Sequence, residues 1–122
     1  MDRILVVDDE IETCNLLSEF LSRKKYDVSI AMSGQEAISR IESNKPKVVL
    51  LDIRMPGMNG MEVLRRVKEM DKDIDVIMIT AVNEDEIGKK AIKLGASDYI
   101  TKPLSLNYLE TAVLLKLFMR EH

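Results

Sequence analysis

Three unbroken runs of four apolar residues constrain the fold of this chain more than any other feature. They cover residues 4–7 (Ile-Leu-Val-Val), 48–51 (Val-Val-Leu-Leu) and 76–79 (Val-Ile-Met-Ile). Continuous apolar runs of this kind are typical of strands that are buried on both faces, as in a parallel sheet covered by helices. Two shorter and more mixed segments, 28–31 and 99–100, are predicted to be further strands nearer to the edges of the sheet.

Between these runs, apolar residues recur at intervals of three and four, which is the spacing of an amphipathic helix. The sets are Leu17, Phe20 and Leu21; Ala37, Ile38 and Ile41; Val63, Leu64 and Val67; Ile87, Ala91 and Leu94; and Leu106, Leu109, Val113 and Leu117. Capping boxes predict helix starts at Ser33, Asn59 and Asn83, and Ser105 is a candidate cap for the last helix. Strand and helix alternate five times, which predicts one doubly wound α/β domain with a five-stranded parallel sheet and helices on both faces.

The composition agrees with a single globular domain over residues 1–122 and argues against several other classes. Hydrophobic residues make up 46% of the chain and charged residues 32%, as is usual for globular proteins. The single cysteine, Cys14, cannot form an internal disulfide, so we expect a reducing, cytoplasmic location. The net charge is −3 without a basic block, which argues against direct nucleic-acid binding. No apolar run approaches the ~18 residues that cross a membrane.

Polar residues follow the predicted strands, at the edge where open parallel sheets bind their ligands. They are Asp8, Asp9 and Glu10 after the first strand, Asp52 after the third, Thr80 after the fourth and Lys102 after the fifth. Crowded carboxylates repel one another, and a Mg²⁺ ion bound through oxygens would relieve that repulsion. A carboxylate nucleophile beside Mg²⁺, an ammonium and a hydroxyl suits the formation of an acyl phosphate.

Each of these residues also has a purely structural interpretation. Asp8 or Asp9 could cap the first helix, Lys102 could be a solvated surface residue, and Thr80 could be an ordinary strand residue. Capping does not explain Asp52, which follows four apolar residues and precedes a segment in which a helix cannot begin directly. The coincidence of polar residues at four strand ends therefore favours a common site.

Four segments, in order, resemble the receiver domain of two-component response regulators, the CheY-like superfamily. They are VVDDE at 6–10, LLDIRMPGMNG at 50–60, ITA at 79–81 and YITKP at 99–103. The resemblance extends from about residue 4 to the last helix. It implies a flavodoxin-like sheet with the strand order 2-1-3-4-5.

The resemblance also implies a phosphoacceptor and a metal site. Asp52 would take a phosphoryl group from a phosphohistidine on a sensor histidine kinase or a histidine phosphotransfer protein. Mg²⁺, or Mn²⁺ in its place, would be bound by Asp9 and Asp52, by Asp8 through water, and by the backbone carbonyl of Arg54. Such a domain is a signalling phosphoacceptor rather than an enzyme, although it assists its own phosphorylation and dephosphorylation.

The remaining implied roles concern the response to phosphorylation. Thr80 would hydrogen-bond a phosphoryl oxygen, Lys102 would pair with another, and the Tyr99 rotamer would report the phosphorylated state. The Lys102–Pro103 peptide bond would be cis. The surface formed by the fourth helix, the fifth strand and the fifth helix would be the interaction face, and a homodimer through it is expected. The output could be that of a stand-alone receiver or of an attached effector such as a transcription regulator.

Two departures from the family pattern and three rival functions remain open at this stage. Asn59 stands where the family usually has aspartate, and Arg54 places a long cation beside the metal site. A flavin-binding protein would need a phosphate beside the acidic residues 8–10, which would repel it. A Mg²⁺-dependent phosphatase with an aspartyl-phosphate intermediate would need its nucleophile after the first strand and a second aspartate at position 10, which is Glu10. A pseudo-receiver that only binds a partner would be expected to lack Asp52, Lys102 or the acidic pair.

Overall fold

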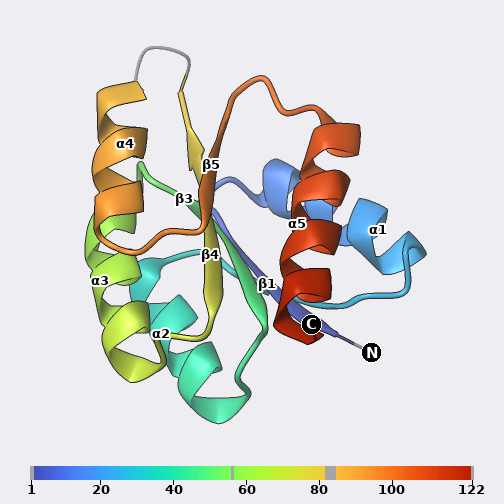
Figure 1. Cartoon of the computed structure of the whole chain (residues 1–122), viewed down its shortest axis with the longest axis horizontal. Helices are drawn as coiled ribbons and strands as arrows, with labels where there is room; N and C mark the ends of the chain where they lie inside the picture. Colours follow the sequence, from blue (N-terminus) through green and yellow to red (C-terminus); the bar gives the residue numbers. More distant parts are fainter. Residues whose placement is uncertain (1, 56, 82–84, 122) are drawn as a thin grey trace.

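A five-stranded parallel sheet forms the centre of the computed structural model, which describes residues 2–55, 57–81 and 85–121 (Figure 1). The strands are β1 (Arg3–Val7), β2 (Asp27–Ala31), β3 (Val48–Asp52), β4 (Asp75–Thr80) and β5 (Asp98–Thr101). Their order is β2-β1-β3-β4-β5, which confirms the predicted topology. The two mixed segments form the edge strands, as expected from their partly polar sequences.

Helices cover both faces of the sheet. They are α1 (Ile11–Arg23), α2 (Gly34–Ser43), α3 (Gly60–Met70), α4 (Asp85–Lys93) and α5 (Leu106–Glu121). Figure 1 shows α1 and α5 on one side of the sheet and α2, α3 and α4 on the other. Among the described residues, no helix has the length and apolar character needed to cross a membrane.

The unbroken apolar runs divide their side chains between two cores. Along β1, Ile4 and Val6 belong to the core under α1 and α5, whereas Leu5 and Val7 belong to the core under α2, α3 and α4. Successive side chains of a strand point to opposite faces. A central strand between two helical layers therefore has to be apolar at every position, which accounts for the pattern found in the sequence.

Side-chain caps begin three of the helices as predicted. Backbone N–H groups donate to Ser33 Oγ at 3.1 Å, to Asn59 Oδ1 at 3.0 Å and to Ser105 Oγ at 3.2 Å. The fourth predicted cap, Asn83, lies outside the described residues, as do Val82 and Glu84 of the same loop and Pro56 after β3.

The start of α1 differs from the capping interpretation of the acidic pair. Glu10 occupies the cap position, and its side chain makes no capping hydrogen bond. The Asp8 carboxylate instead accepts the backbone N–H of Glu10 at 2.9 Å, which tightens the turn between β1 and α1. Neither Asp8 nor Asp9 therefore occupies the cap position of α1.

Candidate functional site

The parallel register brings the ends of four strands to one edge of the sheet. Val7 pairs with Leu51, Asp52 pairs with Ile79, and Thr80 pairs with Thr101. The residues that follow β1, end β3 and β4, and follow β5 are therefore neighbours in space. The structure thus assembles the polar residues that the sequence places after separate apolar runs.

Asp52 and Lys102 form the centre of this edge. The Lys102 ammonium donates to Asp52 Oδ2 at 3.1 Å, and the backbone N–H of Arg54 donates to Asp52 Oδ1 at 3.0 Å. The Asp52 side chain is only 8% exposed. Burial alone would lower the pKa of Lys102, but the hydrogen bond and charge of Asp52, with smaller effects of Asp8 and Glu10, raise it above its usual value. Lys102 is therefore a fixed cation beside a buried carboxylate.

The backbone around Lys102 holds it in this position. Its N–H donates to the carbonyl oxygen of Thr80 at 2.8 Å, which extends the pairing of β4 and β5 beyond the strand ends. The peptide bond between Lys102 and Pro103 is cis, in agreement with the bond implied by the resemblance.

Gly60 allows the start of α3 to approach the strand that carries Asp52. A Cβ atom at position 60 would lie 2.4 Å from the Asp52 carbonyl oxygen and 2.5 Å from the Ile53 Cα, closer than any side chain tolerates. The Gly60 N–H donates to the Ile53 carbonyl at 2.8 Å. This close contact fixes the segment that follows Asp52, and the sequence argument did not assign Gly60 such a role.

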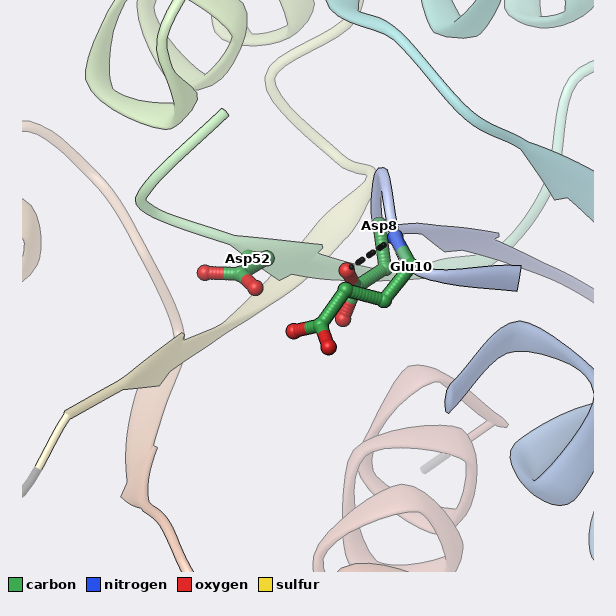
Figure 2. Close-up of side chains that lie close together, drawn as sticks. All are labelled: Asp8, Glu10 and Asp52. Carbon is green, nitrogen blue, oxygen red and sulfur yellow. Dashed lines mark hydrogen bonds between the residues drawn. The ribbon is translucent and has the colours of Figure 1, made fainter. Parts of the chain in front are cut away.

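Asp8 and Glu10 add two further carboxylates to Asp52. Each of the three side chains has an oxygen within 4.8 Å of the others, and Figure 2 shows them extending from the ends of β1 and β3 into one region. Asp8 is almost fully buried, and its Oδ2 has no hydrogen-bond partner among the described residues. Burial raises the pKa of Asp8 to about 6; the Glu10 N–H opposes this rise, and the negative charge of Asp52 adds to it.

This donor set fits a hard divalent cation such as Mg²⁺. Carboxylate oxygens are the ligands that Mg²⁺ prefers, and a buried, unpaired Asp8 oxygen is unfavourable without a positive partner. Asp9, in contrast, is exposed and does not belong to the described cluster. Glu10 lies in it instead, with Oε1 4.0 Å from Lys102 Nζ. The metal-ligand role of Asp9 stays a prediction, and no spacing rule distinguished Glu10 from Asp9 in the sequence.

The hydroxyl of Thr80 is the second buried polar group at this edge, after the Asp8 carboxylate, that has an unpaired atom among the described residues. The residue is 1% exposed, and its Oγ1 has no hydrogen-bond partner within the described part of the chain. A buried hydroxyl without a partner is destabilising by roughly 1–3 kcal/mol. Thr80 is therefore suited to donate to an oxygen that enters the site.

Cys14 of α1 contacts the backbone at Asp8, where the acidic residues 8–10 begin. Its buried Sγ donates to the backbone carbonyl of Asp8 at 3.3 Å. Burial, together with the charge of Asp8, raises the pKa of the Cys14 thiol to about 11. The thiol is therefore protonated at neutral pH, and its contact helps to hold Asp8.

Comparisons with known proteins show which family has this sequence and fold. A family model described as "Response regulator receiver domain" matches residues 4–114. The chain belongs to this family. The receiver domain is 38% identical over 107 residues to Regulatory protein VanRB of Enterococcus faecalis, which covers 88% of this chain and 48% of that protein. It is 35% identical over 112 residues to Sporulation initiation phosphotransferase F of Bacillus subtilis, which covers 92% of this chain and 90% of that protein.

Relatives of this receiver domain differ in length. The chain spans about half the length of VanRB and 43% of Alkaline phosphatase synthesis transcriptional regulatory protein PhoP of Bacillus subtilis, to which it is 39% identical over 103 residues and 84% of its own length. Among solved structures, a two-component response regulator from Clostridium difficile has a TM-score of 0.95 at 28% identity, with all of both chains covered. The fold and the family of the receiver domain are thus shown together.

Proposed function

We propose that this receiver domain accepts a phosphoryl group on Asp52 from a phosphohistidine of a sensor histidine kinase or a histidine phosphotransfer protein. A carboxylate oxygen of Asp52 forms the new bond to phosphorus while the bond from phosphorus to the donor's imidazole nitrogen breaks, and the electron pair of that bond stays with the imidazole. The observation that carries this proposal is the pairing of the buried Asp52 carboxylate with Lys102 beside an unpaired Asp8 oxygen. Positioning and charge neutralisation are the main requirements of phosphoryl transfer.

Mg²⁺, when bound, would neutralise charge on the transferred group. Its proposed ligands are Asp52, Asp8 through water, Asp9 and the backbone carbonyl of Arg54. The clustered carboxylates and the unpaired Asp8 oxygen support a cation at this edge.

Lys102 and Thr80 would act on the phosphoryl oxygens. Lys102 already contacts Asp52 and could exchange this carboxylate for a phosphoryl oxygen, which carries more negative charge. The buried hydroxyl of Thr80 would donate to another oxygen and so gain the partner that it lacks. Tyr99, half-buried on β5, would respond to this change.

The response would alter the face formed by α4, β5 and α5. Exposed apolar side chains of these helices include Ile92 of α4 and Tyr108 and Leu115 of α5, and the exposed Leu94 directly follows α4. We propose that phosphorylation promotes a homodimer through this face in the cytoplasm, and that the same change controls an effector where one is attached.

Intact-mass analysis after incubation with acetyl phosphate tests the acceptor. The wild-type protein should gain the mass of one phosphoryl group in the presence of Mg²⁺ and none in EDTA. Asp52→Asn should gain none, whereas Asp27→Asn, at the far end of edge strand β2, should behave as wild type. Equal phosphorylation of Asp52→Asn and wild type would contradict the assignment. A wild-type protein that is never phosphorylated would instead favour the alternative of a pseudo-receiver.

A further inference from the structure

A glycine lies in the middle of α4, where the helix would be more stable with almost any other residue. The helix spans only nine residues, Asp85–Lys93, and Gly88 is buried within it. Glycine destabilises a helix interior relative to alanine, because it loses more backbone freedom on folding. A compensating reason for Gly88 should therefore exist in its surroundings.

The ring of Tyr99 occupies the space that a side chain at position 88 would need. A Cβ atom on Gly88 would lie 2.6 Å from Tyr99 Cδ2 and 2.8 Å from both Cε2 and Cγ. Atoms of a rigid aromatic ring cannot be approached so closely, so the ring or the helix would have to move. The position of the Tyr99 ring in this structure thus requires glycine, which has no side chain, at position 88.

Tyr99 also shares a face of the sheet with Thr80. Tyr99 pairs with Met78 across β4 and β5, and Thr80 lies two residues after Met78 on the same strand. Because side chains two residues apart point to the same face, Thr80 and Tyr99 both point to the side of α4. Tyr99 also lines a groove of about 330 Å³, together with Pro103, Ser105 and Tyr108 among others. The Tyr99 ring therefore lies against α4, on the face of the sheet to which Thr80 also points.

We propose that Gly88 is the positioning residue for Tyr99 and that it couples α4 to the phosphorylation site. Because Gly88 has no side chain, the Tyr99 ring can lie against the α4 backbone. A shift of Thr80 that changes the space beside the Tyr99 ring would move the ring, and the ring would in turn move α4. This coupling rests on the proposed function, since it needs a phosphoryl group on Asp52 as its trigger. A methyl group at position 88 separates α4 from the ring before any phosphoryl group arrives.

The positioning role can be tested by thermal unfolding of a double-mutant cycle. Gly88→Ala in the wild-type background should lower the Tm, because the methyl group collides with the ring. In a Tyr99→Ala background the collision is absent, so the same substitution should raise the Tm through its better helix propensity. A shift of the same sign and size in both backgrounds would overturn the role. If Gly88→Ala alone does not fold and the double variant does, the cycle supports it.

The coupling can be tested with Mg²⁺ and beryllofluoride as the phosphoryl probe. Bound beryllofluoride is followed by ¹⁹F NMR, and the Tyr99 ring by ¹³C-labelled tyrosine with Tyr99→Phe to assign its signal. The wild-type ring signal should shift on binding. Gly88→Ala should bind the probe equally well, but its ring shift should fall to less than half. An undiminished shift would overturn the coupling. A wild-type protein that binds no probe would contradict the proposed function and the coupling with it, while the unfolding cycle still decides the positioning role.

Discussion

Replacing Asp8 by asparagine should stabilise the protein when no divalent cation is present. Burial, with the charge of Asp52, raises the pKa of Asp8 from 3.8 to about 6. The folded state therefore holds this proton more tightly than the unfolded chain does. As the pH rises through this interval the unfolded chain releases the proton first, so folding loses stability, and the full loss is present above about pH 6. Two pKa units correspond to roughly 3 kcal/mol of unfolding free energy.

Asparagine removes the charge and keeps the oxygen that accepts the Glu10 N–H. At about pH 7.5 in EDTA, Asp8→Asn should therefore be more stable than wild type by up to about 3 kcal/mol, or roughly 10 °C in Tm for a domain of this size. Well below pH 3.8 the Asp8 carboxyl is protonated in both states, so the gain should disappear. Mg²⁺ should stabilise wild type more than the variant and so reduce the difference.

Urea unfolding followed by circular dichroism measures these free energies. Asp9→Asn is the matched control, because Asp9 is exposed and outside the cluster, and in EDTA it should change stability little. The reasoning would be refuted if Asp8→Asn and wild type were equally stable in EDTA at neutral pH. It would also be refuted if the gain were the same at acid and at neutral pH, because a packing effect would not depend on ionisation.

Two further predictions follow from the surroundings of Cys14 and from the exposed face of α4. Since the Cys14 thiol is buried and its pKa is raised to about 11, a disulfide reagent should label it slowly in the folded protein and rapidly in urea; rapid labelling of the folded protein would contradict this environment. Beryllofluoride with Mg²⁺ should increase the sedimentation coefficient, and Ile92→Ser, which alters an exposed side chain of α4, should abolish the increase; an increase that survives Ile92→Ser would exclude α4 from the dimer face.

The central strands were predictable because a strand that is buried on both faces has an unbroken run of apolar residues in the sequence. Every residue of β3 is buried, and so is all of β1 except Arg3, whereas β2 and β5 are partly exposed at the edges. The caps at Ser33 and Asn59 were predictable for a similar reason, since a local hydrogen bond joins residues three positions apart. The periodicity of apolar residues and the hydrogen bonds between residues close in sequence therefore allow most of the fold to be predicted.

Side-chain positions in loops and contacts between distant residues were less accessible. Of the two adjacent acidic residues Asp9 and Glu10, only Glu10 lies in the described cluster with Asp8 and Asp52. The conformation of the turn after β1 decides this, and no periodicity in the sequence reports it. Leu94 has helical spacing but is 45% exposed, and it lies one residue beyond the end of α4 at Lys93. The only indication of the contact between Gly88 and Tyr99 in the sequence is an isolated glycine within a segment of helical spacing, and this does not identify the partner residue.

The division of the interior into two cores has a consequence for how partners can recognise this protein. Thr80 and Tyr99 point to the layer that contains α4, whereas Cys14 and Leu17 of α1 pack on the opposite side of the sheet. A rearrangement of α4 can therefore proceed while α1 keeps its shape. Under the proposed coupling, a partner that binds α1 would contact a surface that is the same in both phosphorylation states. A partner that binds α4 would contact a surface that differs between the two states.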